Sequence, residues 1–207
     1  MNPRPPRCRI ICKGGLMYTT GEDVRALEEK FGRPYVTDMR YEIRAAEFDI
    51  VKSSMGRGRA HDVTMFIRNR ERPDDIVVIR KPFFPAGAFR APSGAAEKGE
   101  GLEAGAVREG REETGLDIGI ERYLVRVNAV FSNEGRRIEW TTHVFEAGHA
   151  PGQIDPIDKE EIAQARWASL DELQGPIRQV LLDTGWGLFG YRVALTDLVV
   201  DRLGAKR

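Results

Sequence analysis

The first 56 residues carry short runs of alternating apolar and polar positions. Strand-like runs at residues 7–13 and 16–20, separated by two glycines, predict a β-hairpin. A capping-box pattern at Thr20 and Asp23 predicts the start of a helix, and a glycine and a proline predict its end near residue 32. The apolar face of this helix would consist of Val24, Leu27 and Phe31. Alternation over residues 46–51 predicts a further strand.

The pattern changes from residue 60. Strand-like runs follow at residues 63–68, 76–80, 123–131 and 139–145. Helical patterns occupy residues 102–114, begin again near Leu170 and cover residues 191–203 with a broad apolar face. Strands with a few interspersed helices predict a mixed α/β (α+β) domain. We therefore expect an N-terminal extension over residues 1–56 and a main domain over residues 57–207.

Composition narrows the class of protein. With 41% hydrophobic residues and 31% charged ones, the chain is expected to fold around a sizeable core. Its 32 basic and 32 acidic side chains leave no net charge, which disfavours sequence-independent binding to nucleic acid or acidic membranes. The apolar runs are too short to span a bilayer, and the N-terminus lacks a signal-peptide pattern, so we expect a cytoplasmic protein. Cys8 and Cys12 are expected to be buried thiols on one strand.

Residues 94–117 reverse the charge balance, with seven acidic and three basic side chains. In a helix over residues 102–114, Glu109, Glu112 and Glu113 share a stripe about 100° wide. A hard cation such as Mg²⁺ would stabilise this cluster, and a charged surface helix is the alternative interpretation. Arg108, four residues before Glu112, could orient its carboxylate, and Glu100 could supply a further oxygen.

Residues 94–116 resemble the Nudix box, G-x5-E-x7-R-E-U-x-E-E-x-G-U, where U is a bulky aliphatic residue. Eight of its nine defined positions match, namely Gly94, Glu100, Arg108, Glu109, Glu112, Glu113, Gly115 and Leu116. The exception is Gly110, which stands where an aliphatic residue is expected and costs about 1 kcal/mol relative to alanine in a helix interior. A weaker resemblance extends over about residues 60–175.

The resemblance implies an α/β/α sandwich with a mixed central sheet and a metal-dependent pyrophosphohydrolase. Mg²⁺ or Mn²⁺ would be the cofactor, and the substrate would be a nucleoside diphosphate linked to another group. Glu112 and Glu113 would be the main metal ligands, with Glu109 a ligand or the general base. Gly94, through a loop carbonyl, and Glu100 would complete the metal site, while Arg108 would orient the carboxylates. In some relatives the base comes from a distant loop, where the candidates here are Glu160 and Glu161.

Substrate and partners are less constrained. Arg80, Lys81 and Arg90 are candidates for binding phosphate oxygens, with solvated loop charges as the alternative. Phe83, Phe84 and Phe131 would either stack on a base or lie in the core. Nucleotide sugars and related ADP-ribose-like compounds are the leading substrate class. A nucleotide-binding sensor without turnover is the alternative function, although the intact carboxylates favour an enzyme. A role in mRNA decapping, and nucleic acid as a partner, are disfavoured by the charge balance. The N-terminal hairpin predicts a possible homodimer.

Overall fold

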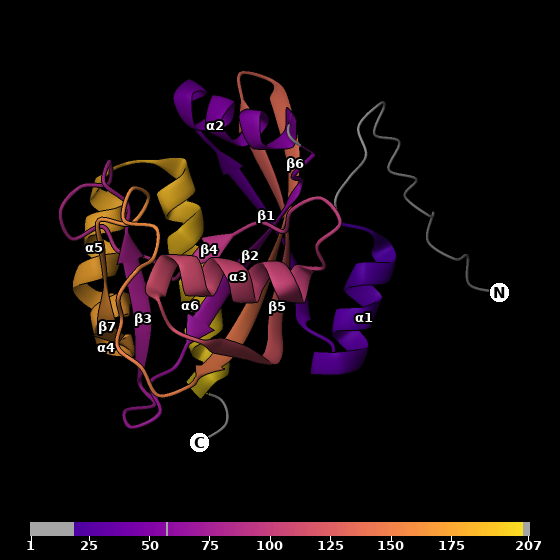
Figure 1. Cartoon of the computed structure of the whole chain (residues 1–207). Helices are drawn as coiled ribbons and strands as arrows, with labels where there is room; N and C mark the ends of the chain where they lie inside the picture. Colours follow the sequence, from indigo (N-terminus) through magenta and orange to yellow (C-terminus); the bar gives the residue numbers. More distant parts are fainter. Residues whose placement is uncertain (1–18, 57, 205–207) are drawn as a thin grey trace.

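The computed structural model describes residues 19–56 and 58–204 (Figure 1). Its elements are α1 (Gly21–Phe31), β1 (Tyr35–Glu42), α2 (Ala45–Gly56), β2 (His61–Ile67), β3 (Asp75–Arg80), β4 (Ser93–Gly94), α3 (Leu102–Thr114), β5 (Ile118–Asn133), β6 (Arg136–His149), β7 (Gln164–Ser169), α4 (Leu170–Glu172), the π-helical turn η1 (Leu173–Ile177), α5 (Arg178–Asp183) and α6 (Gly187–Gly204). The predicted hairpin, with Cys8 and Cys12, lies outside the described residues except for Thr19 and Thr20, so the homodimer it suggested stays a prediction. Within the described ranges, no helix has the length and apolar character needed to cross a bilayer.

Five strands form one mixed sheet in the order β1-β5-β6-β2-β4. β5 and β6 are antiparallel, while β1 runs parallel to β5 and β2 runs parallel to β6. β4 pairs with β2 through only Ser93 and Gly94, which brings the segment before α3 onto the edge of the sheet. β3 and β7 form a separate antiparallel pair. This mixed sheet with interspersed helices confirms the predicted α/β class.

Helices cover both faces of the five-stranded sheet, so that β2 is buried on both sides. Val63 and Met65 belong to a hydrophobic cluster with Ala106 of α3. Phe66, which points the other way along the strand, belongs to a second cluster with Val193 of α6. The α/β/α sandwich is therefore confirmed, with α3 crossing one face and α6 covering the other (Figure 1).

The predicted first helix is present as α1. The Thr20 hydroxyl accepts a hydrogen bond from the Asp23 backbone N–H, and the Asp23 carboxylate accepts one from the Thr20 backbone N–H. Leu27 is buried at the centre of the apolar face and packs with the cluster under α3. The capping box and the hydrophobic face therefore act as the sequence predicts.

The strand predicted at residues 46–51 is wrong, because these residues lie in α2. Alternation would place Phe48 and Ile50 on one buried face of a strand. The helix instead buries Phe48 and Val51 and leaves Ile50 54% exposed. The carboxylate of Glu47, 2% exposed, accepts hydrogen bonds from the first backbone N–H groups of α6, so a tertiary contact determines the conformation here.

β1 was not predicted from the sequence. Its side chains alternate between exposed and half-buried, and Met39 and Tyr41 pack against the core below α6. Every residue of β1 pairs with β5, from Tyr35 opposite Val125 to Glu42 opposite Ser132. The strand thus belongs to the central sheet, although it precedes residue 57. The division into residues 1–56 and 57–207 stays a prediction.

Gly110 lies at the buried side of α3, where an aliphatic side chain was expected. A Cβ atom on this glycine would lie 2.3 Å from Cδ1 of Ile118. The Ile118 side chain from β5 therefore fills the volume next to the helix. Gly115 ends α3 in the left-handed conformation, as predicted, with φ of 75°. The departure from the box pattern is thus compensated by packing from a neighbouring strand.

A buried histidine pair below α1 is expected to make the fold sensitive to mild acid. Nε2 of His143, which is fully buried, lies 2.9 Å from Nδ1 of His61. Burial lowers the pKa of both imidazoles, and that of His143 falls well below its usual value. The unfolded chain therefore binds more protons than the folded chain below pH 6.5. The free energy of unfolding should consequently fall as the pH drops from 7 to 5, by up to about 1.4 kcal/mol per pH unit for each histidine.

Urea unfolding of the wild type and of His61→Gln at pH 5, 6 and 7 measures this dependence. We expect the wild type to lose stability at each step and the variant to show a shallower slope. A wild-type stability that is constant over this range would contradict the prediction.

Candidate functional site

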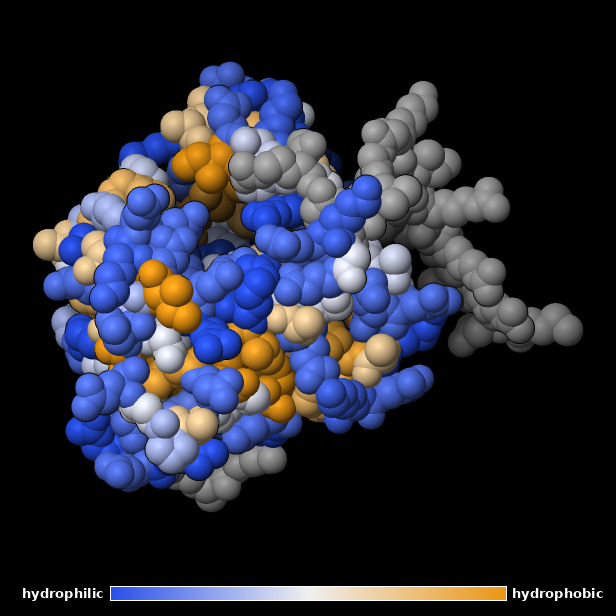
Figure 2. All heavy atoms as spheres, in the orientation of Figure 1, coloured by the Kyte–Doolittle hydropathy of each residue, from blue (hydrophilic) through white to orange (hydrophobic). Residues whose placement is uncertain are grey.

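One cleft brings the sequence-predicted acidic helix together with segments from both ends of the described chain. Its volume is about 500 Å³. The acidic side is lined by Glu97, Glu109, Glu112, Glu113, Asp158 and Glu161. The opposite side is lined by residues of α2, of the β3–β4 loop and of the first turns of α6, among them Ile50, Phe84 and Phe189. Figure 2 shows this hollow between α2 and α3, with hydrophobic surface at its α2 edge and hydrophilic surface towards α3.

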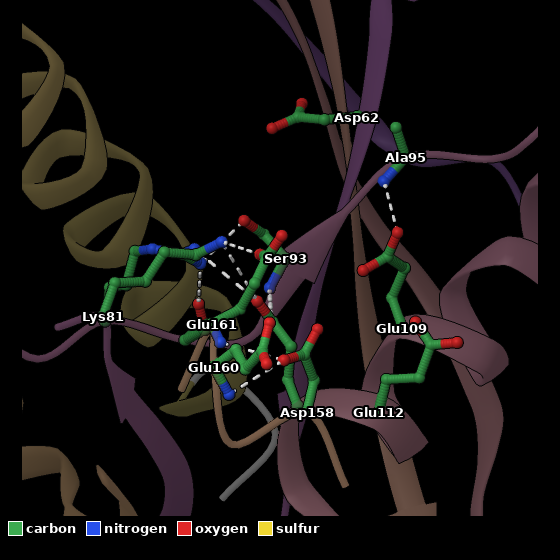
Figure 3. Close-up of polar contacts among 12 residues, drawn as sticks. Asp62, Lys81, Ser93, Ala95, Glu109, Glu112, Asp158, Glu160 and Glu161 are labelled. Atoms are coloured by element: carbon green, nitrogen blue, oxygen red, sulfur yellow. Dashed lines mark hydrogen bonds and ion pairs between the residues drawn. The ribbon is translucent and has the colours of Figure 1, made fainter. Parts of the chain in front are cut away.

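Two carboxylates of α3 accept hydrogen bonds from backbone N–H groups, one of β4 and one of the residue that follows it. Oε2 of Glu113, a residue only 4% exposed, accepts a hydrogen bond of 2.8 Å from the Ser93 N–H. Oε1 of Glu109 accepts one of 3.3 Å from the Ala95 N–H, as drawn in Figure 3. Gly94 lies between these two contacts, and a Cβ atom there would be 2.0 Å from Cδ of Glu109. Glycine is therefore required for the close approach of the Glu109 carboxylate to the strand.

Arg108 connects the acidic groups at the edge of the cleft. It donates hydrogen bonds of 3.0 Å to Glu100 and to Glu112, and one of 2.9 Å to the Ala95 carbonyl. The hydrogen bond from Arg108 lowers the pKa of Glu100 and raises that of the guanidinium. Arg108 thus lies where it can orient Glu112, while Glu100 contacts Arg108 and does not line the cleft.

The predicted basic residues differ in their positions. Arg90 is buried in the wall, where it donates to the Ser93 hydroxyl at 2.7 Å and lies 3.8 Å from Glu113. Lys81 lines the cleft and forms an ion pair of 2.6 Å with Glu161. Arg80 points elsewhere, with hydrogen bonds to Gln164 and to the Phe84 carbonyl. Lys81 and Arg90 therefore border the carboxylates, whereas Arg80 does not line the cleft.

Burial has the largest effect on the pKa values of Glu113 and Arg90. It raises the pKa of Glu113 to about 7, although Arg90, Lys81 and the Ser93 N–H act in the opposite direction. It lowers the pKa of Arg90 to about 10, so that this guanidinium remains protonated at neutral pH. A further positive charge near Glu113 would lower its pKa and favour the ionised carboxylate.

The loop before β7 lies beside the acidic helix, with Asp158 close to Glu112 (Figure 3). The backbone N–H of Asp158 donates to the Glu112 carbonyl at 3.1 Å. The Asp158 carboxylate accepts hydrogen bonds from the N–H groups of Glu160 and Glu161, a turn that directs these two side chains differently. Glu161 lines the cleft with Lys81, whereas Glu160 is exposed and does not line it. Asp158 also lines the cleft, although it was not selected from the sequence.

Further cleft residues were missed because they lie outside the recognised motif. Asp62 of β2 accepts hydrogen bonds from Arg192 of α6 at 3.0 Å and from the Trp140 indole at 2.9 Å. Trp186 and Phe189 at the start of α6 also line the cleft. An isolated Asp, Arg or Trp has no spacing signal, and only the fold brings these side chains together. Phe131 lies in the core, 2% exposed, at the base of the cleft.

The donor chemistry of the acidic side fits a hard divalent cation. All side-chain donors from Glu109, Glu112 and Glu113 are carboxylate oxygens, which Mg²⁺ and Mn²⁺ prefer. The Glu112 side chain is 44% exposed, and Arg108 contacts its carboxylate at 3.0 Å. Over residues 19–56 and 58–204, no three acidic, His or Cys side chains already lie close enough to form a metal site. The three carboxylates are instead bound by Arg108 and by backbone N–H groups.

Comparisons with known proteins agree with the box at residues 94–116. A NUDIX domain model matches residues 58–184, more than half of the chain. The protein is 35% identical over 109 residues to the NAD-capped RNA hydrolase NudC of Stutzerimonas stutzeri (strain A1501), covering 52% of this chain and 37% of that protein. It is 31% identical over 103 residues to the uncharacterized Nudix hydrolase YvcI of Bacillus subtilis (strain 168), covering 49% of this chain and 62% of that protein.

Among solved structures, the MutT protein from Methanosarcina mazei Go1 has a TM-score of 0.46 and 22% identity, covering 67% of this chain and 95% of that one. The chain thus spans only part of its relatives: the alignments with NudC and YvcI cover 37% and 62% of those two proteins. The family model, by contrast, includes the complete box and the strands that support it. On this match, the chain belongs to the Nudix family.

Proposed function

We propose that this protein is a metal-dependent hydrolase that cleaves the pyrophosphate linkage of a nucleoside diphosphate joined to another group. The observation that carries the proposal is the set of three α3 carboxylates at one end of a cleft bordered by Lys81 and Arg90. Carboxylates suit a cation, and the two basic side chains complement a diphosphate. Hydrolysis of phosphoric anhydrides depends mainly on such positioning and charge stabilisation.

Glu109, Glu112 and Glu113 would hold Mg²⁺ or Mn²⁺, with the carbonyl of Gly94 as a further candidate ligand. A cation bound there would neutralise the diphosphate and make its phosphorus more susceptible to attack by water. Arg108 orients the Glu112 carboxylate from the side, through the 3.0 Å hydrogen bond. Arg90 holds Ser93 and borders Glu113, which fixes the strand against the acidic helix.

Glu161 is our candidate for the general base, with Glu109 as the alternative. Oε2 of Glu161 accepts a hydrogen bond from Lys81, so Oε1 of Glu161 is the atom expected to take a proton from the attacking water. Lys81 also lies 3.9 Å from Glu113, and therefore connects the loop carboxylate to the acidic helix. The loop position places Glu161 on the acidic side of the cleft, where Lys81 lies between it and Glu113 of α3.

A hydrolysis panel tests the proposed function. ADP-ribose, UDP-glucose, NAD, diadenosine tetraphosphate, a deoxynucleoside triphosphate and coenzyme A would be incubated with Mg²⁺, Mn²⁺ or EDTA. Because similar proteins are named for capped RNA, an NAD-capped oligonucleotide is included, which also tests the expectation that nucleic acid is not a partner. We expect metal-dependent turnover of at least one diphosphate-linked compound, with nucleotide sugars and ADP-ribose as the leading class. Saturable nucleotide binding without any turnover would contradict the hydrolase and favour a sensor.

Glu161→Gln is expected to lower kcat about 10²-fold, because general-base catalysis contributes on that order. Glu160→Gln is the matched control, since its side chain lies in the same loop but does not line the cleft. The measurement is steady-state hydrolysis of the best panel substrate by both variants. Wild-type rates in both variants would contradict Glu161 as the base and leave Glu109 as the candidate.

A further inference from the structure

The apolar side of the cleft is a continuous row of aromatic rings. Phe83 contacts Phe84 edge to face, with centroids 4.9 Å apart, and Phe84 contacts Phe189 in the same way at 4.8 Å. Phe189 in turn stacks on Trp186, with centroids 5.5 Å apart and an interplanar angle of 18°. All four residues line the cleft. The row therefore extends along the wall opposite the acidic helix.

Two members of this apolar wall are strongly exposed. Phe83 is 68% exposed at one end of the aromatic row, and Ile50 of α2 is 54% exposed at the mouth of the same cleft. Val51 and Ser54 extend the α2 side of the wall. Large apolar side chains that line a concave surface are typical of ligand contact rather than of a solvated face. The hydrophobic surface at the α2 edge of the hollow is visible in Figure 2.

Glu47 fixes α2 to the start of α6. Its carboxylate, 2% exposed, accepts hydrogen bonds from the N–H groups of Leu188 at 2.8 Å and Gly187 at 3.3 Å. It also accepts one from the Arg44 N–H at 3.0 Å, at the beginning of its own helix. One buried side chain therefore caps two helices and holds α2 and the start of α6 in a fixed arrangement at the apolar side of the cleft. Both helices lie outside the residues matched by the family model.

We propose that the apolar recess of the cleft, between α2, the β3–β4 loop that carries Phe83 and the start of α6, binds the flat ring of a nucleobase. It rests on the proposed function in that it places the base of a nucleotide at one end of the cleft and its phosphates at the other. Phe83 and Ile50 are the contact residues, and Glu47 is a positioning residue. An aromatic row offers ring faces that stack on any base and ring edges that contact its face, whereas a sugar or an aliphatic group gains less from it.

Binding of AMP and ribose 5-phosphate tests this assignment, because the two compounds carry the same phosphate and differ in the ring. Isothermal titration calorimetry with Mg²⁺ would compare the wild type, Phe83→Ala, Phe83→Tyr and Ile50→Ser. The wild type should bind AMP about tenfold more tightly than ribose 5-phosphate. Phe83→Ala and Ile50→Ser should remove most of this preference, and Phe83→Tyr should retain it. Tyr35→Ala, at an exposed aromatic residue that does not line the cleft, is the control and should behave as the wild type.

Equal binding of the two compounds by the wild type, or an unchanged preference in Phe83→Ala and Ile50→Ser, would overturn the assignment. The readout does not depend on turnover. Ring-dependent binding without hydrolysis of any panel compound would therefore support the recess and contradict the hydrolase. Hydrolysis without ring-dependent binding would support the hydrolase and contradict the recess.

Discussion

Replacing Glu112 with glutamine is expected to lower kcat for the best panel substrate about 10³-fold, because loss of a metal-ligating carboxylate removes several kcal/mol of charge stabilisation. The Glu112 side chain lines the cleft and is 44% exposed, so the substitution removes a charge without leaving a cavity. The free energy of unfolding should therefore change by less than about 0.5 kcal/mol. Steady-state kinetics and urea unfolding measure the two effects.

Glu103→Gln is the matched control for this change. Glu103 lies on the same helix, where it pairs with Lys30 at 2.7 Å and does not line the cleft that contains Glu109 and Glu113. It should keep wild-type kinetics. If Glu112→Gln retained more than a tenth of the wild-type kcat, Glu112 would not be an essential ligand.

Gly94→Ala is expected to lower kcat about 10²-fold. The new Cβ atom would lie 2.0 Å from Cδ of Glu109, so the carboxylate has to leave its place beside the Ala95 N–H. Because the displaced atoms belong to the end of a flexible side chain, the helix and the strand are expected to remain in position. The effect should therefore appear in kcat rather than in the midpoint of thermal unfolding.

Gly101→Ala separates this effect from any general cost of replacing glycine near α3. Gly101 precedes the helix with φ of −71°, and nothing lies within 4 Å of where its Cβ atom would be. Kinetics of the two variants, measured side by side, should differ by about the full 10²-fold expected for Gly94→Ala. Equal kcat values would show that the Glu109 carboxylate does not need its place against β4.

Local sequence patterns correctly predicted the helices whose caps and apolar or charged faces are formed by their own residues. α1 has its capping box and apolar face, and α3 has a helical stripe of carboxylates and a glycine that ends it. α2 was misread because its Glu47 is buried by hydrogen bonds to α6, whereas its Ile50 is exposed at the cleft. No local pattern could predict the hydrogen bond between Glu47 and Gly187, which are 140 positions apart in the chain.

The candidate site shows the same division. The box placed Glu109, Glu112 and Glu113 correctly on one side of the cleft, because their spacing fixes their positions on a single helix. The aromatic wall and the Asp62–Arg192 contact come from segments that meet only in the folded sheet. Within the loop before β7, the turn made by Asp158 decided which glutamate faces the cleft, and the sequence alone did not distinguish them.

Hydrolysis in ¹⁸O-labelled water, followed by mass spectrometry of the products, tests the central claim most directly. The wild type and Glu112→Gln would each be incubated with a mixture of the panel compounds in Mg²⁺. We predict that the wild type releases a nucleoside phosphate and a second phosphorylated product, with one ¹⁸O atom in one of them, and that Glu112→Gln releases almost none. Absence of labelled product from every compound, or equal amounts from the two proteins, would contradict the assignment of this cleft as the active site of a hydrolase.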